Sequence, residues 1–591
     1  MFLVPGYYLC RIKNIISSNL FINLMSNLPI IECVPNFSEG RDQAIIDQIA
    51  AAIASVEGVE LLNVDPGKAT NRTVVTFAGT PQAVVEAAFR GIKTAQTLID
   101  MRQHKGEHPR MGATDVCPFV PISNATLADC VACANALAQK VANELQIPIY
   151  LYEAAAKHPD RKNLANIRAG EYEGLPEKLI HPDWAPDFGP KIWNESIAKS
   201  GATVIGARPF LIAYNINLNT TSTRRANSVA FDVREAGRVL REGNPITGKI
   251  ITDSEGNPIR QPGALKGVKA IGWFIEEYGI AQISMNLTDI ETSPLHLAFD
   301  EVCESADRRG LRVTGSEIVG LVPLQAMLAA GKYFLRKQQR SVGVDDAELV
   351  RIAIKSLGLA ELAPFNPDER IVEYVLAKNE KRPLVNLTLQ QFTNETASDS
   401  PAPGGGSVAA LAGALGVALA TMVANLSSHK RGWDERWEYF SDWAEKGQAI
   451  KTELLKLVDD DTASFNVLLE AMRMPKNTPE EKAARAAAIQ NATLGAIDVP
   501  MRTLELATNS MEIIAAMVEQ GMSSSISDAA TGAACARAAA TGAYLNVCTN
   551  AQGLTNMEVR QNLMQKAQNL FHTATHTETE IFNKVMAKMQ G

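Results

Sequence analysis

Two histidines, a glutamate and an arginine occur within one short segment, His104-Lys-Gly-Glu-His108-Pro-Arg110. Imidazole titrates near neutral pH, so a histidine here can serve as a general acid or a general base. Gly106 and Pro109 oppose a helix, and we therefore expect this segment to be a loop that a scaffold holds in place.

The spacing of His104, Glu107 and His108 also fits the H-x-x-E-H zinc pattern. That pattern requires both histidines on one face of a continuous helix, which the glycine and the proline disfavour. His572 and His576 lie one helical turn apart, but no carboxylate or cysteine accompanies them at an obvious ligand spacing. The sequence therefore predicts no metal site. A lone Cys130-x-x-Cys133 pair indicates two buried structural thiols.

The C-terminal third contains a concentrated acidic run, Asp459-Asp-Asp461. Successive residues of a helix point about 100° apart, so only one or two of these carboxylates can face a pocket. Like charges nearby would raise the pKa of such a carboxyl, which suits a group that both accepts and returns a proton. The run Gly404-Gly-Gly-Ser407 opens a helix whose exposed amides could receive a carboxylate. It lacks the Lys-Ser/Thr ending of a nucleotide-binding P-loop.

The first half of the chain alternates strand-like and helix-like segments. Strands are predicted at 29–35, 59–64, 73–78 and 148–151, and helices at 41–55, 81–101 and 126–145. A similar order recurs with strands at 210–218, 270–274 and 282–287 and helices at 222–241 and 294–309, with a hairpin tip at Ser254-Glu-Gly-Asn257. The pattern predicts an α+β half made of two ferredoxin-like β-α-β-β-α-β subdomains, the first with an extra helix.

From residue 388 the sequence is rich in alanine and has long helical periods. Helices are predicted at 464–474, 478–501, 523–547 and 556–589, which indicates an all-α bundle. The uncharged segment 407–429 is long enough to span a bilayer, but alanine and glycine dominate it, so we expect a closely packed buried helix and no membrane partner. The predicted organisation is an extension (1–28), two subdomains (29–206 and 207–355), a linker (356–387) and the bundle (388–591).

Composition narrows the class of protein further. The chain has 591 residues with 46% hydrophobic and 21% charged residues, typical of a globular protein with several domains. A net charge of −8 argues against a general nucleic-acid binder. Eight dispersed cysteines indicate reduced thiols and a cytoplasmic location. Arg11 and Lys13 interrupt the apolar run that a signal peptide would need. Met25 leads directly into the first predicted strand, so we expect translation to begin there and the preceding residues to have no structural role.

Longer strings of sequence resemble one enzyme family. In the first half these are Ile31-Glu-Cys-Val-Pro-Asn-Phe-Ser-Glu-Gly40, the segment from His104 to Phe119, Arg168-Ala-Gly-Glu-Tyr-Glu173, Asp183-Trp-Ala-Pro-Asp-Phe-Gly-Pro190 and Asn215-Ile-Asn217. In the second half they are Ala402-Pro-Gly-Gly-Gly-Ser407, Leu457-Val-Asp-Asp-Asp461 and Met474-Pro-Lys-Asn-Thr-Pro-Glu-Glu-Lys482. From about residue 29 onward, the chain resembles the formimidoyltransferase-cyclodeaminases, the bifunctional folate enzymes of histidine degradation.

The resemblance implies that the first half transfers a formimino group from N-formimino-L-glutamate to N5 of tetrahydrofolate. It places the catalytic base at His108 and an orienting acid at Asp65. Arg110 is predicted to receive a substrate carboxylate. A folate-contacting stretch is carried over to Asp183, Gly189, Pro190 and Gly201, although residues 191–200 depart from the family pattern in length and in residues.

For the helical half, the resemblance implies closure of 5-formiminotetrahydrofolate to 5,10-methenyltetrahydrofolate with release of ammonia. It selects Asp461 as the catalytic acid and base. The exposed amides at the start of the helix make Gly404, Gly405, Gly406 and Ser407 candidate substrate contacts, and the alternative is that these glycines only permit tight packing. The resemblance also implies a homo-oligomer, tetrahydrofolate as a polyglutamylated co-substrate, and no metal.

Two alternatives stay open at this point. A formamide differs from an amidine by one oxygen in place of NH, so the chain could be a glutamate formyltransferase with methenyltetrahydrofolate cyclohydrolase-type activity. A non-catalytic folate-binding scaffold would be favoured by loss of His108 or Asp461, and both residues are present.

Overall fold

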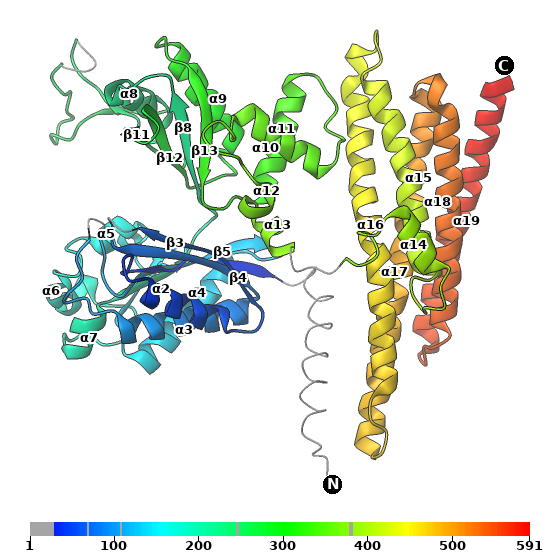
Figure 1. The fold of residues 1–591 in the computed structure, drawn as a ribbon, viewed down its shortest axis with the longest axis horizontal. Coiled ribbons are helices and arrows are strands. Elements are labelled where there is room, and N and C mark those ends of the chain that lie inside the picture. Colours follow the sequence, from blue (N-terminus) through cyan, green and yellow to red (C-terminus); the bar gives the residue numbers. More distant parts are fainter. Residues whose placement is uncertain (1–28, 68–69, 107–108, 244–247, 378–381, 591) are drawn as a thin grey trace. The chain divides into compact units, whose positions relative to one another are not determined.

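The computed structural model describes residues 29–67, 70–106, 109–243, 248–377 and 382–590. Those residues form two compact units (Figure 1). One contains the described parts of Leu24–Met327 and Leu357–Asn379, and the other those of Leu328–Ser356 and Glu380–Gly591. A mixed α/β region is thus followed by a helical region, as the sequence predicts. The predicted extension, residues 1–28, lies outside the described residues, and the predicted domain limits stay predictions.

The first sheet has the strand order β3-β4-β1/β2-β5-β7-β6. Its central strands are antiparallel, and β7 and β6 extend the β5 edge in parallel. The strands are β1 (Ile30–Cys33), β2 (Asn36–Phe37), β3 (Val59–Gly67), β4 (Arg72–Gly79), β5 (Thr114–Ser123), β6 (Ile149–Glu153) and β7 (Thr203–Ala207).

One face of this sheet is covered by α2 (Gln43–Ala54), α3 (Pro81–Leu98) and α4 (Leu127–Leu145) (Figure 1). Helix α4 begins at Thr126 in a capping box, in which Thr126 and Asp129 each accept a backbone N–H of the other. Cys130 and Cys133 on α4 are buried free thiols, which confirms the structural role predicted for this pair.

The second sheet repeats the same connectivity with four strands. Its order is β11-β12-β8-β13 and every pairing is antiparallel. The chain passes in turn through β8 (Ile212–Leu218), α8 (Thr223–Val233), β11 (Val268–Ile275), β12 (Ile280–Leu287), α9 (Leu295–Asp307) and β13 (Val313–Val319). The predicted hairpin tip is confirmed, since Asp253 Oδ1 accepts the backbone N–H groups of Glu255 and Asn257. The helix predicted at 222–241 ends early, at Val233.

The helices α10 (Leu324–Lys337) and α11 (Asp346–Leu357) precede α12 (Pro367–Arg370) and α13 (Val372–Ala377). The turn between α10 and α11 is buried against the helical region. Val342 N donates to Ser441 Oγ at 3.0 Å, and the carbonyl of Gly343 accepts from the side-chain amides of Asn425 and Gln448. Residues 328–356 therefore pack with the C-terminal helices.

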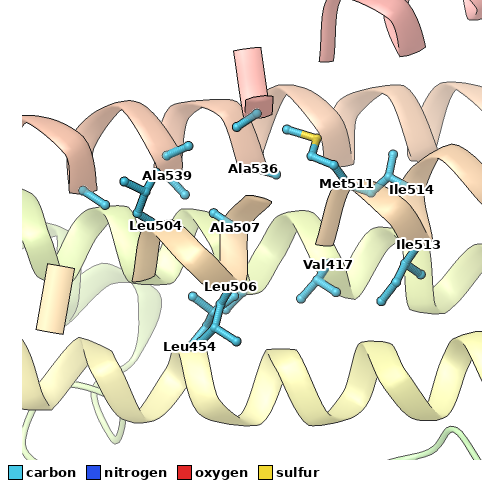
Figure 2. Packing of buried hydrophobic residues seen from close by; sticks show 14 of the residues in the cluster. Val417, Leu454, Leu504, Leu506, Ala507, Met511, Ile513, Ile514, Ala536 and Ala539 are labelled. Atoms are coloured by element: carbon cyan, nitrogen blue, oxygen red, sulfur yellow. The ribbon is translucent and has the colours of Figure 1, made fainter. Parts of the chain in front are cut away.

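The helical region is built on five long helices that lie side by side (Figure 1). Their apolar faces meet in one core, in which Val417, Leu454, Leu504 and Ile514 interdigitate (Figure 2). Gly416 and Gly532 let two of the helices approach closely, because a Cβ on either would lie 2.7 Å from the other's carbonyl oxygen. The short α14 (Leu389–Thr396) precedes the five, which are α15 (Gly405–Ser428), α16 (Trp437–Arg473), α17 (Pro479–Gln520), α18 (Ile526–Ala551) and α19 (Met557–Gln590).

Helix α17 continues past Pro500, although the sequence predicts that it ends near residue 501. A proline inside a helix leaves the carbonyl four residues earlier without its usual donor. Here that carbonyl belongs to Ala496, and it accepts a hydrogen bond from Asn550 Nδ2 of α18 at 2.7 Å. The neighbouring helix thus supplies the missing donor, and α17 runs to Gln520.

Among the described residues, α15 is the one helix long and apolar enough to cross a membrane by length and composition. Within its most apolar window, 61% of the residues are buried inside the helical region. This burial is what we expect of a core helix.

Candidate active sites

The histidine-rich segment is a tethered loop in the first subdomain. Its described residues form no helix, and Glu107 and His108 lie outside the described residues. His104 Nε2 is 2.8 Å from the carbonyl oxygen of Asn71, and Asn71 Nδ2 donates to the carbonyl of Lys105 at 3.1 Å. A Cβ at Gly106 would lie 2.2 Å from the carbonyl oxygen of Thr70, so the loop requires glycine there. These contacts hold the N-terminal side of the loop against the start of β4.

Arg110 lies at the other end of the loop and is already paired with two carboxylates. Its guanidinium donates to both oxygens of Glu173, at 2.7 and 2.8 Å, and to Glu171 at 3.0 Å. The predicted carboxylate-binding role of Arg110 requires a guanidinium that a substrate can reach. In the structure Arg110 fixes the 168–173 segment to the loop, and its contact with a substrate carboxylate stays a prediction.

A buried ionic cluster adjoins this loop, and sequence reasoning did not single it out. Asp115 on β5 is fully buried and accepts from Met111 N at 3.1 Å and from Arg168 Nε at 3.3 Å. Arg168 ends α5 (Leu164–Arg168), and its Nη2 also bonds Asp115. Arg72 Nη1 lies 3.7 Å from the same carboxylate, and Arg72 Nε donates to Asn36 at 2.9 Å. Two guanidinium groups therefore share one buried carboxylate.

Among the predicted folate-binding residues, Gly201 adjoins the loop. It forms a bridge with Gly112, and a Cβ on it would lie 2.2 Å from the carbonyl oxygen of Met111. Gly189 has φ +85°, a conformation that favours glycine, and packs against Ile147. Pro190 follows it, half-buried, and Asp183 is an exposed residue of the 3₁₀ turn Pro182–Trp184.

The turn that contains Asp183 is held by a residue that sequence reasoning missed. Asp187 pairs with Arg161 at 2.7 Å, with both side chains 3% exposed, and accepts from Leu151 N at 2.8 Å. These contacts would also be present if the turn were only a rigid part of a pocket wall. A direct folate contact of Asp183 stays a prediction.

Asp65 lies near the exposed end of β3, opposite Val74 of β4. No hydrogen bond or ion pair of its carboxylate is present among the residues that the structure describes. Its predicted partner, His108, is outside that part of the chain, so the base–orienter pair stays a prediction.

The second sheet has a polar ladder on the face that α8 and α9 do not cover. Trp273 Nε1 donates to Gln282 at 3.2 Å, and Gln282 Nε2 donates to Asn217 at 2.9 Å. Asn217 donates to Glu361, and Asn215 donates to Glu317, each at 2.9 Å. The Asn215-Ile-Asn217 string thus sends both amides to one face, as expected for alternate residues of a strand.

In the helical region, Asp461 of α16 packs against the first turn of α15. Ser407 Oγ donates to Asp461 Oδ2 at 3.1 Å and lies 3.3 Å from Thr462 Oγ1. A Cβ on Gly406 would lie 2.1 Å from Asp461 Oδ1, so glycine is needed for this approach. The structure therefore brings together three of the predicted residues, Gly406, Ser407 and Asp461. Gly404 is the N-cap of α15, and Gly405 follows it, 3.4 Å from Asn546 when a Cβ is added.

The three consecutive aspartates have separate roles. Asp459 accepts the backbone N–H groups of Leu384 and Val385, at 2.8 and 3.2 Å, and so fixes the segment before α14. Asp460 lines a cavity of about 530 Å³ together with Lys332 and Arg382, and Asp461 is not part of its lining. Burial raises the pKa of Asp461, and the hydrogen bonds from Ser407 oppose that rise. The cause of the raised pKa is therefore desolvation rather than the like-charged neighbours proposed from the sequence.

We predict that Gly406→Ala strongly impairs the site at Asp461. The added methyl group would overlap the carboxylate, and both groups lie on packed helices, so Asp461 must move. We expect at least a tenfold loss of the reaction of this site, with the first half of the protein unaffected. Gly495→Ala is the matched control, because a Cβ there meets nothing within 4 Å. A Gly406→Ala protein with full activity would contradict the assignment of this site.

Among the described residues, no cluster of three histidine, cysteine or acidic side chains could hold a metal ion. His576 is exposed and lies 3.4 Å from Glu580 in the next turn. His572, one turn earlier, is exposed as well, and the absence of a metal stays a prediction.

Comparison with known proteins accounts for both halves of the chain. Residues 30–208 match the family model of the formiminotransferase domain, N-terminal subdomain, and residues 213–377 that of the formiminotransferase domain. Residues 388–569 match the formiminotransferase-cyclodeaminase model.

Three relatives illustrate the relationship. The chain is 42% identical over 546 residues to the formimidoyltransferase-cyclodeaminase of Gallus gallus, which covers 92% of this chain and 96% of the relative. Its first half is 42% identical to the glutamate formimidoyltransferase of Streptococcus pyogenes serotype M1 (52% of this chain, 93% of the relative). The helical half is 34% identical to the methenyltetrahydrofolate cyclohydrolase of Methylorubrum extorquens (34% of this chain, 98% of the relative). The chain belongs to the formimidoyltransferase-cyclodeaminase family.

Proposed function

We infer that this chain is a bifunctional folate enzyme of histidine degradation. It transfers the formimino group of N-formimino-L-glutamate to tetrahydrofolate and then converts 5-formiminotetrahydrofolate to 5,10-methenyltetrahydrofolate and ammonia. The observation that carries this conclusion is the near full-length match to enzymes with both activities.

In the transfer step, N5 of tetrahydrofolate attacks the amidine carbon and loses a proton, while the glutamate nitrogen gains one and departs. We propose His108 as the group that moves these protons and Asp65 as its orienting partner. The tethers of His104, Lys105 and Met111 support this proposal, because they fix the loop on both sides of His108. We also propose folate contacts along 183–201, supported by the close approach of Gly201 to the loop.

In the cyclisation step, N10 attacks the formimino carbon and the exocyclic nitrogen leaves as ammonia. When the formimino group enters as its protonated amidinium form, the exocyclic nitrogen already carries two protons, and the proton lost by N10 is the third that it needs to leave as ammonia. One carboxyl group suffices to carry this proton, and the methenyl product keeps the positive charge. We propose that Asp461 is this shuttle and that Gly404, Gly405, Gly406 and Ser407 contact the substrate. A raised pKa supports this role, because such a carboxylate is a stronger base than an exposed one.

The decisive experiment supplies formiminoglutamate and tetrahydrofolate to the purified chain. We expect the absorbance of methenyltetrahydrofolate to appear together with one equivalent of ammonia. A protein that binds folate but forms neither product would instead be the non-catalytic scaffold.

A second candidate function for the helical half is cyclohydrolase-type action, favoured by the cyclohydrolase relative. In the cyclohydrolase reaction, water adds to methenyltetrahydrofolate and opens its ring to give a formyltetrahydrofolate. In the reverse of the cyclodeaminase reaction, ammonia would open the same ring to give formiminotetrahydrofolate. Parallel assays with 5-formiminotetrahydrofolate and with methenyltetrahydrofolate distinguish the two, since ammonia is released only in the cyclodeaminase reaction.

We propose further that both α/β subdomains are ferredoxin-like units. The shared chain order and the matching strand orders β3-β4-β1/β2-β5 and β11-β12-β8-β13 support this proposal. Cysteine usage is the basis on which we propose a cytoplasmic location. We also propose that the folate co-substrate is polyglutamylated and that the enzyme needs no metal.

A homo-oligomer is our last proposal of this kind. Helix α15 exposes large apolar side chains at Val408, Leu415 and Met422, spaced seven residues apart and hence on one face. A second copy that covers this stripe would remove it from water. We predict that light scattering gives a mass above that of one chain and that Leu415→Glu lowers it. A monomeric mass for the fully active enzyme would contradict the proposal.

A further inference from the structure

We propose that the guanidinium pair Arg72 and Arg168, held by Asp115, binds a carboxylate of the amino-acid donor. This inference rests on the proposed transfer reaction. The formimino donor carries two carboxylates, each only a few bonds from the reacting amidine. A receptor for either one must therefore lie beside the loop that bears the proposed base.

The cluster meets this positional requirement through backbone connections. Arg72 directly follows Asn71, whose carbonyl and amide hold His104 and Lys105. Asp115 accepts from Met111 N, three residues beyond His108. The cluster is thus bound to the loop on both of its sides.

The charge of the cluster favours an anion. Within the described residues, two guanidinium groups share one carboxylate in a mostly buried place, so the formal charges of these three side chains sum to +1. Burial and the neighbouring Arg168 lower the pKa of Arg72 to about 10, against the opposing effect of Asp115. An added carboxylate would neutralise the excess charge and so favour binding.

Both arginine side chains are partly exposed to solvent. Each side chain keeps 14% of its surface exposed, whereas Asp115 keeps none. Arg168 uses Nε and Nη2 on Asp115, and within the described part of the chain its Nη1 has no acceptor. Arg110, by contrast, already forms ion pairs with two carboxylates, those of Glu171 and Glu173. Arg168 is therefore the better receptor, and Asp115 aligns it.

The test measures discrimination between donors rather than activity alone. The probes are formiminoglutamate and its two mono-amides, in which either the α- or the γ-carboxylate is a neutral carboxamide. We expect the wild type to prefer formiminoglutamate over one mono-amide by about tenfold or more in kcat/KM, since a hydrogen bond to a charged group is lost. In Arg168→Gln this preference should fall close to unity, with the KM for tetrahydrofolate little changed.

Controls separate a binding role from a structural one. Arg168→Lys keeps the charge but loses the fork of donors, so it should retain an intermediate preference, and it also serves if Arg168→Gln does not fold. Arg90→Gln, in an exposed ion pair with Glu86, should keep the full preference. An unchanged preference in Arg168→Gln, with both mono-amides, would overturn this inference. A wild-type protein without any formimino transfer would instead overturn the proposed function.

Discussion

Asp461→Asn is expected to stop ammonia release and to accumulate 5-formiminotetrahydrofolate. The asparagine keeps the size of the side chain and can still accept from Ser407, but it cannot carry the proton from N10 to the leaving nitrogen. General acid–base groups contribute roughly a hundredfold to ten-thousandfold, so cyclisation should fall by about a thousandfold while formimino transfer persists. Stopped assays with chromatographic separation of the two folates measure both steps.

The matched control is Asp460→Asn, which removes the same charge one residue away, from a side chain that lines the cavity beside Lys332 and Arg382. It should cyclise at the wild-type rate. Cyclisation by the wild type should also decline as the pH falls through the raised pKa of Asp461, because the carboxylate form accepts the N10 proton. The residual rate of Asp461→Asn should lack this decline. Full activity of Asp461→Asn would remove the residue from the mechanism.

The sequence predicts the elements best where local periodicity agrees with packing. The segments around β3, β4, α3 and α4 are correct within a few residues, because alternating or helical apolar patterns coincide with burial there. Strand β5 was not predicted, and it contains Pro118 and Pro121, which ordinarily demote a strand. In the sheet the carbonyl of Pro118 accepts from Val34 N, and Pro121 pairs with Ile31 next to a register shift. Only the partner strand shows that these prolines are tolerated.

The continuation of α17 past Pro500 has the same kind of cause. The acceptor that proline leaves unpaired is met by Asn550, fifty residues further along the chain. No local pattern contains that information, since it depends on how α18 packs against α17.

Some residues of the candidate sites could be predicted from the sequence, and others are brought together only by the fold. Family strings pointed to Gly406, Ser407 and Asp461, and the structure brings these residues into contact. The cluster of Arg72, Asp115 and Arg168 was not predicted, although Asp115 and Arg168 lie within strings that carried the resemblance. Its members come from β4, β5 and the end of α5, and only the folded sheet shows that two cations share one carboxylate. Arg110 looked available in the sequence because its partners Glu171 and Glu173 lie sixty residues away.

His108→Ala is expected to abolish formimino transfer while leaving cyclisation of supplied 5-formiminotetrahydrofolate intact. Loss of the proposed base should lower transfer by roughly a hundredfold to ten-thousandfold. The loop is held by contacts of Asn71, His104, Lys105 and Asp115, none of which involves the side chain of residue 108, so the variant should still fold. The two activities are expected to separate because the loop and Asp461 belong to different compact units.

The matched control is His158→Ala, an exposed histidine of the same subdomain whose side chain makes no capping hydrogen bond. It should transfer the formimino group at the wild-type rate. A tenfold change in rate corresponds to about 1.4 kcal/mol of activation barrier. If His108→Ala keeps transfer within tenfold of wild type, the increase in barrier is smaller than the loss of a general base would cause. That result would place the base elsewhere, and His104, already hydrogen-bonded to Asn71, would be the first residue to replace next.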